Sequence, residues 1–139
     1  MKKSFLLFLS FALLNSPVWA FQWDKVYEDE NEVSFLDKET IVEAINNKQN
    51  IKEFWVKSIH LDDSLQKDTG LPQNVSVLIV KVKTNCKNKT FAIEEVRMWD
   101  LQEKQLINTI KTPVSKLDWT KMHGKNRYGI LATKVCEFN

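Results

Sequence analysis

Apolar and polar residues alternate along most of the chain, which is typical of half-buried β-strands. The clearest case is Val75 to Thr84, in which Leu78, Val80 and Val82 share one face, and that parity continues to Cys86. Other strands are predicted at Gln22 to Glu28, Glu32 to Leu36, Ile51 to Leu61, Phe91 to Asp100 and Lys104 to Lys111. The last three strands are joined by short polar connections, which favours an antiparallel meander.

Strict alternation also predicts the faces of the later strands. Phe91, Ile93 and Trp99 should lie on one face of the sheet. Leu106 and Ile110 should likewise share one face of the next strand, opposite to Ile107. The sheet should then end at Pro113, because proline cannot donate to a strand ladder.

A short helix is predicted between the second and third strands. Asp37 stands where a helix N-cap is expected, and Lys38 to Asn46 follows it. Ile41, Val42 and Ile45 would point inward from this helix.

Cys86 and Cys136 are the only cysteines in the chain. An apolar stripe at helical spacing, from Tyr128 to Val135, predicts a helix that ends near Cys136, although Gly129 within it costs about 1 kcal/mol relative to Ala. Neither cysteine belongs to a Cys-x-x-Cys motif or a Cys/His cluster, which redox and metal sites usually need. We therefore favour a structural disulfide that holds the C-terminal helix against one face of the sheet.

Residues 1–20 have the pattern of a bacterial signal peptide. Two lysines near the N-terminus precede a ten-residue apolar run, and Val18-Trp19-Ala20 resembles a cleavage site. A membrane anchor is the alternative, but the run is shorter than the about 20 residues that span a bilayer. Cleavage after Ala20 would leave residues 21–139 as a single exported domain without a transmembrane segment, located in the periplasm, on the cell surface or outside the cell. Such compartments favour disulfides.

The charge balance narrows the range of partners. The whole chain has a formal net charge of +2, and Lys2 and Lys3 of the predicted signal peptide account for it. The exported domain is thus formally neutral, and a neutral domain lacks the positive charge that binds nucleic acid. We expect no nucleic-acid partner.

Several segments occur in the order and spacing of a known family. They are Trp23, Phe35 to Ile41, Phe54 to Lys57, Asn85-Cys86, Met98-Trp99-Asp100, Trp119 and Val135-Cys136. Together they resemble the bacterial surface-adhesin E family over nearly all of residues 21–139.

The resemblance implies both a fold and a role. The implied fold is α+β, an antiparallel sheet of about six strands with a C-terminal helix packed on one face and held by a disulfide. The implied role is binding to host extracellular-matrix or serum proteins, and members of this family can form homodimers.

Four lysines around Cys86 form the one local excess of charge that we single out as a binding site. They are Lys81, Lys83, Lys87 and Lys89. A basic patch of this kind could bind an acidic host protein or a glycosaminoglycan. The alternative is an ordinary solvated strand and turn, in which lysines also discourage edge-to-edge aggregation.

The remaining polar residues indicate no catalytic or metal-binding site. His60 and His123 are the only histidines, and neither lies in a recognisable nucleophile motif. Asp62 and Asp63 beside His60 could bind a metal weakly, but a solvated loop is the more common explanation. Four tryptophans remain after cleavage, and they are expected in the core or between sheet and helix. They are Trp23, Trp55, Trp99 and Trp119.

We therefore expect a non-enzymatic binding protein without catalytic, metal or cofactor sites. The favoured role is that of an adhesin acting on an extracellular protein. The alternative is a periplasmic structural or inhibitory protein that acts on a bacterial envelope partner.

Overall fold

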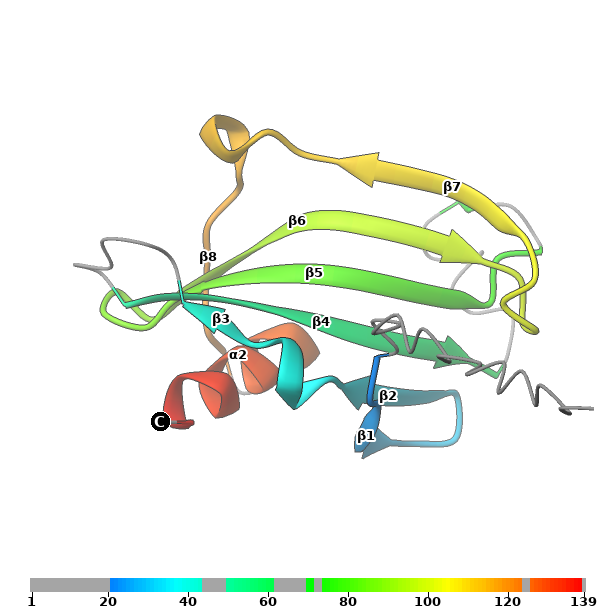
Figure 1. Cartoon of the computed structure of the whole chain (residues 1–139), viewed down its shortest axis with the longest axis horizontal. Helices are drawn as coiled ribbons and strands as arrows, with labels where there is room; N and C mark the ends of the chain where they lie inside the picture. Colours follow the sequence, from blue (N-terminus) through cyan, green and yellow to red (C-terminus); the bar gives the residue numbers. More distant parts are fainter. Residues whose placement is uncertain (1–20, 44–49, 62–69, 72–73, 124–125, 139) are drawn as a thin grey trace, which may run out of the picture.

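In the residues that the structure describes, the alternating segments form one antiparallel sheet of eight strands, with a helix on one of its faces (Figure 1). The strands are β1 (Asp24–Glu28), β2 (Glu32–Leu36), β3 (Val42–Glu43), β4 (Ile51–His60), β5 (Val77–Asn85), β6 (Thr90–Trp99), β7 (Leu106–Lys111) and β8 (Thr120–Lys121). The helix is α2 (Arg127–Glu137), and η1 (Lys38–Thr40) and η2 (Val114–Lys116) are 3-10 turns. The predicted α+β fold class is confirmed.

The computed structural model describes residues 21–43, 50–61, 70–71, 74–123 and 126–138. The predicted signal peptide, residues 1–20, lies outside them. Within the described residues, six strands cross the sheet in the order β1-β2-β4-β5-β6-β7, while β3 pairs with β4 and β8 with β6. The predicted meander is confirmed for β5, β6 and β7. No helix in this part of the chain is long and apolar enough to cross a membrane.

The hydrophobic core lies between α2 and the sheet face that α2 covers, which we call the inner face. The strands contribute Leu36, Phe54, Val56, Val80, Val82 and Phe91, and the helix contributes Leu131, Ala132 and Val135. Full burial of one large apolar side chain contributes about 1.5–3 kcal/mol, so this layer is the main source of stability. The predicted helical stripe is confirmed, since Tyr128 also packs against this cluster.

A disulfide between Cys86 and Cys136 joins the end of β5 to the last turn of α2. The two Cα atoms are 5.6 Å apart, and the cysteines are separated by 50 residues in the sequence. Parity along β5 places Cys86 on the inner face, as predicted. Closing a loop of this length contributes about 4 kcal/mol in the chain-entropy model.

Polar contacts hold both ends of α2. Lys52 is buried on the inner face, and its Nζ donates to the carbonyl oxygens of Val135 (3.4 Å) and Phe138 (2.5 Å). A cation is favourable there because the C-terminal end of a helix dipole is negative. At the other end, Arg127 forms an ion pair with the buried carboxylate of Glu32.

The ion pair of Arg127 and Glu32 belongs to a small polar network under the start of α2. Ser34 Oγ lies 2.9 Å from Glu32 Oε1, to which it donates, and 3.2 Å from Ser58 Oγ. Burial raises the pKa of the Tyr128 phenol, which also interacts with Ser58 and Arg127. These contacts satisfy polar groups that would otherwise be costly inside the core.

Gly129 is explained by a close approach of two backbone segments. A Cβ atom at this position would lie 3.0 Å from the carbonyl oxygen and 3.1 Å from the nitrogen of His123. The residue that weakens the helix by propensity therefore lets the helix lie against the segment before it.

The predicted helix at Lys38 to Asn46 is wrong over its described part. Only Lys38–Thr40 forms a 3-10 turn, capped by Asp37, and Val42–Glu43 is strand β3. Residues 44–46 lie outside the described residues. β-branched residues from Thr40 onward disfavour a helix, and β3 pairs with the part of β4 that β2 leaves open.

The sheet also continues after Pro113, contrary to the prediction. Thr120–Lys121 forms β8, which pairs with Thr90 and Phe91 of β6. The chain leaves the sheet after β7, passes through η2 and returns to the same strand (Figure 1).

Two irregularities overturn the predicted faces of β6 and β7. In β6 an extra residue at Glu94 interrupts the register, so that Ile93 pairs with Val82 and lies on the inner face. Trp99 pairs with Val77 and lies on the opposite face. A bulge reverses parity along a strand, and simple alternation cannot follow it.

The second irregularity lies between β6 and β7. Leu106 pairs with Trp99, whereas Ile110 pairs with Val96 of the inner face. Leu106 and Ile110 are therefore on opposite faces rather than on the same face.

The disulfide predicts a large loss of stability when it is removed. Cys136→Ser should lower the melting temperature by about 10–20 °C, because the unfolded chain regains the entropy of a long loop. A reductant should lower the melting temperature of the wild type to a similar value and leave the variant unchanged. Equal melting temperatures of oxidised and reduced wild type would contradict this account.

Removing the charge of Lys52 should lower the stability of the fold less than removing the disulfide does. Lys52→Met should lower the free energy of unfolding by about 1–2 kcal/mol in denaturant titrations, because the last carbonyl groups of α2 lose a charged donor. Lys134→Met, at an exposed position of the same helix, is the matched control and should change stability little. Equal stability of the two variants would mean that water replaces the lysine.

Candidate binding face

The face opposite α2, which we call the outer face, is the face of the three central strands that the helix does not cover. Cross-strand register arranges its side chains in rows. One row holds Lys57, Ile79 and Arg97, and the next holds Ile59, Val77 and Trp99. Trp55 stands two residues before Lys57 on β4, so it occupies the neighbouring row of the same face.

Three aromatic side chains gather over this face and form what we call the aromatic cluster: Phe21, Trp23 and Trp55. The rings of Phe21 and Trp23 are stacked, with centroids 4.8 Å apart and planes inclined by 21°. Phe21 also meets Trp55 edge-on, with centroids 6.0 Å apart. Such pairs contribute about 0.5–1.5 kcal/mol beyond the area that they bury.

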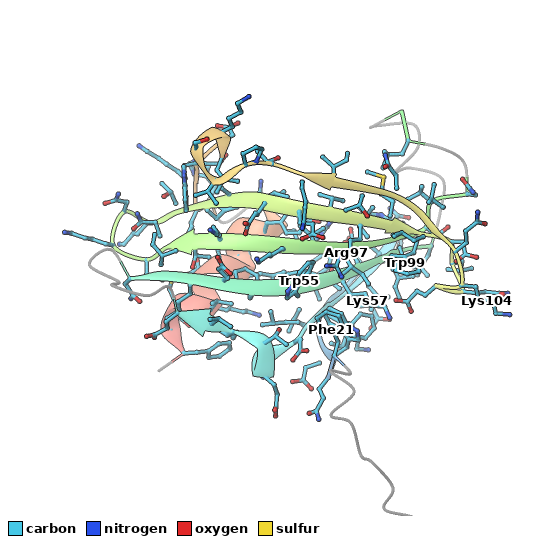
Figure 2. All side chains as sticks on the ribbon, turned by 45° about the horizontal axis from the view of Figure 1, so that its top comes forward. Phe21, Trp55, Lys57, Arg97, Trp99 and Lys104 are labelled. Carbon is cyan, nitrogen blue, oxygen red and sulfur yellow. A yellow bond between two sulfur atoms is a disulfide. The ribbon has the colours of Figure 1, made fainter. Side chains whose placement is uncertain are left out.

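Two cations complete the cluster. The Arg97 guanidinium lies 4.6 Å from the centroid of Trp55, and the Lys57 ammonium lies 5.9 Å from that of Trp23. Figure 2 shows Phe21, Trp55, Lys57 and Arg97 close together over the middle strands. Trp, Arg and Phe at partly exposed positions are the composition of a recognition surface.

Both cations are also paired with carboxylates. Lys57 Nζ lies 2.7 Å from Glu103 Oε2, which comes from the turn between β6 and β7. Arg97 Nε lies 2.8 Å from Glu95 Oε1 on its own strand. The cluster therefore presents aromatic and guanidinium surface with little excess charge.

Trp99 lies beside the cluster, at the same end of the sheet as the turn that carries Lys104 (Figure 2). Its indole Nε1 is buried and has no hydrogen-bond acceptor among the described residues. The prediction that the tryptophans pack in the core or between sheet and helix is wrong. Trp55 and Trp99 are half-buried on the outer face, and Trp119 is exposed between η2 and β8.

The charged quartet, Glu53, Lys81, Lys83 and Glu94, occupies the next part of the outer face. Lys81 lies between two carboxylates, 3.4 Å from Glu53 and 3.3 Å from Glu94. Lys83 lies 3.0 Å from Glu53 and 3.9 Å from Glu94. The bulge in β6 turns Glu94 toward these lysines. Two of the four lysines predicted as a basic patch are thus neutralised.

The ion pairs shift the pKa values of Glu53 and Lys81 in the directions expected for neighbours of opposite charge. Burial by itself would raise the pKa of the Glu53 carboxyl, but Lys83 and Lys81 together lower it below its ordinary value. Burial would lower the pKa of Lys81, but Glu53 and Glu94 outweigh it and raise the pKa. Each charge therefore stabilises its neighbours.

Lys87 and Lys89 differ from the lysines of the quartet. Both are exposed in the turn between β5 and β6, next to the disulfide. The four lysines thus occupy two environments, and an acidic partner at this turn stays a prediction.

The two histidines belong to no metal site among the described residues. His60 is half-buried at the end of β4, opposite Glu32, and His123 is exposed before α2. Asp62 and Asp63 lie outside the described residues. Among those that are described, no three His, Cys, Asp or Glu side chains are placed to hold a metal.

A hollow of about 290 Å³ lies between β6 and the segment that connects β7 to β8. It is lined by apolar side chains such as Ile93, and by the charged Lys116 and Asp118. It lies at the opposite end of β6 from Trp99, and no sequence-predicted site residue lines it.

Sequence reasoning missed the aromatic cluster, although one signal was available. Phe54 and Val56 are the buried neighbours of Trp55, and alternation alone places Trp55 on the face opposite them. No comparable signal marks Phe21 and Trp23, which reach the outer face from the segment before β1.

Comparison with known proteins identifies no relative. No protein-family model, curated protein or solved structure matches this chain. The resemblance to the surface-adhesin E family therefore stays a prediction from sequence.

The lowered pKa of Glu53 predicts a dependence of stability on pH. A carboxyl whose pKa is lowered in the folded protein stabilises the fold at pH values above its ordinary pKa of 4.5. This stabilisation is lost as the pH falls through the lowered pKa. Glu53→Gln should therefore cost roughly 0.5–1 kcal/mol at neutral pH. The gap to the wild type should narrow as the pH falls below 4.5 and close once the carboxyl is protonated in the folded protein.

Thermal unfolding at several pH values measures this gap. The control is Glu30→Gln, at an exposed position of the turn between β1 and β2, which should follow the wild type throughout. A gap for Glu53→Gln that does not depend on pH would contradict the ionic explanation.

Proposed function

We propose that the protein is an exported, non-enzymatic binding protein that binds an extracellular protein through its outer face. The observation that carries this proposal is Trp55 with the Arg97 guanidinium over its ring, on the sheet face that α2 does not cover. Binding energy at protein interfaces is concentrated in Trp, Tyr and Arg side chains.

The charges of the outer face favour a protein over a polyanion. Lys57, Arg97, Lys81 and Lys83 all have carboxylate partners. A polyanion gains affinity mainly from unmatched cations, whereas a protein partner gains it from packing against aromatic rings with a polar rim.

Three features support an extracellular role. The Cys86–Cys136 disulfide suits an oxidising compartment. Residues 1–20 have the pattern of a signal peptide. The resemblance to the surface-adhesin E family names host extracellular-matrix or serum proteins as the partner class. The non-enzymatic part of the proposal rests on the lack of a nucleophile motif in the sequence.

Substitution of Trp55 tests the proposal. In a pull-down from serum and matrix extracts, Trp55→Ala should retain at least about tenfold less of the captured protein than the wild type, since a central anchor is worth roughly 2 kcal/mol or more. Trp119→Ala removes an exposed tryptophan near β8 and should retain the same amount as the wild type.

Circular dichroism and thermal unfolding establish that both variants are folded. Equal retention by Trp55→Ala and the wild type would show that the outer face is not the binding site.

A further inference from the structure

The chain's own N-terminal segment, Phe21 to Trp23, is seated on the outer face as a ligand would be. Phe21 contacts the edge of Trp55, and Trp23 lies under the ammonium of Lys57. Between them the backbone N–H of Gln22 donates to Asp37 Oδ2 at 3.1 Å. Two rings at alternate positions and one backbone donor thus hold the segment.

Asp37 forms an acceptor that is built into the fold. The residue is 1% exposed. One oxygen, Oδ1, accepts the N–H of Glu39 at 3.0 Å and caps η1, while Oδ2 accepts the N–H of Gln22. A buried carboxylate oxygen needs a donor. If the segment left, this oxygen would face the vacated surface and would favour another backbone N–H.

The segment is held less firmly than the strand that follows it. From Asp24 onward the chain pairs with β2 along a ladder. Residues 21–23 lie before this ladder, and they are held by the rings of Phe21 and Trp23 and by the hydrogen bond from Gln22 to Asp37. Residues 21–23 can therefore leave the outer face without opening the sheet.

We propose that Trp55, Arg97 and Asp37 form a receptor for an extended peptide with aromatic side chains at alternate positions. Phe21 to Trp23 occupies this receptor until a partner segment of the same kind displaces it. This inference rests on the proposed function, because it uses the same face and names the chemistry of the partner. Alternate residues of an extended chain point to one side, so two rings can reach the surface together.

Occupation by the chain's own segment sets the affinity for a partner. A short tether gives the segment an effective concentration in the millimolar range, with which any partner must compete. The apparent affinity for a partner equals the affinity of the open receptor multiplied by the fraction of molecules whose receptor is open. Weakening the segment should therefore raise the affinity for an added peptide.

The test uses the full chain expressed with its own leader, and an acetylated tetrapeptide with the sequence of residues 21–24. Titration calorimetry should show that the double variant Phe21→Ala/Trp23→Ala binds the peptide at least about tenfold more tightly than the wild type. Adding Trp55→Ala to the double variant should abolish binding. A peptide with alanine in place of both aromatic residues should not bind.

A second variant addresses the hydrogen bond to Asp37. Gln22→Pro removes the N–H donor while both rings remain, and it should also raise the affinity for the peptide. Trp119→Ala is the matched control and should bind as the wild type does. Thermal unfolding of each variant establishes that the sheet is intact.

Two results would overturn the inference. One is that neither variant binds the peptide more tightly than the wild type, and the other is that binding does not depend on Trp55. The pull-down from serum and matrix extracts distinguishes failure of the displacement model from failure of the proposed binding function. If Phe21→Ala/Trp23→Ala loses the captured protein as Trp55→Ala does, the segment is part of the binding surface, and only the displacement model fails.

Discussion

The packing of α2 against the inner face is the constraint on which the rest of the structure depends. The helix covers the core residues of β4, β5 and β6, and the Cys86–Cys136 disulfide makes this arrangement covalent. Lys52 and the pair of Arg127 and Glu32 hold its two ends. A partner cannot reach the inner face unless these contacts break together. The outer face, the edges and the turns are what remains for recognition.

The outer face has to stay soluble while it carries partly exposed aromatic side chains. Large apolar patches on a monomer invite aggregation. Here the rings of the aromatic cluster alternate with Lys57 and Arg97, and the charged quartet adjoins them. Because each cation has a carboxylate partner, this surface combines apolar packing area with little net charge. The same composition that keeps the sheet soluble suits a protein partner.

Much of the fold could be predicted because it depends on local periodicity. The parity of Val80 and Val82 runs on to Cys86, and this placed the disulfide on the face that α2 covers. The bulge at Glu94 could not be predicted, since it depends on pairing between β5 and β6 rather than on a local pattern. β3 was missed for a related reason, because its pairing with β4 outweighs the cap at Asp37. In the same way, a sequence pattern cannot indicate that Phe21 folds onto Trp55.

The helix and the segment before β1, which cover opposite faces of the sheet, are held with different strength. The helix is fixed by a disulfide and by side chains such as Val135 that are fully buried. The segment from Phe21 to Trp23 is half-exposed, lies before the first strand and meets one buried acceptor, Asp37. A cover that can leave without breaking the core costs the fold little when a partner replaces it. Exchange on this sheet is therefore confined to the outer face, where the aromatic surface lies.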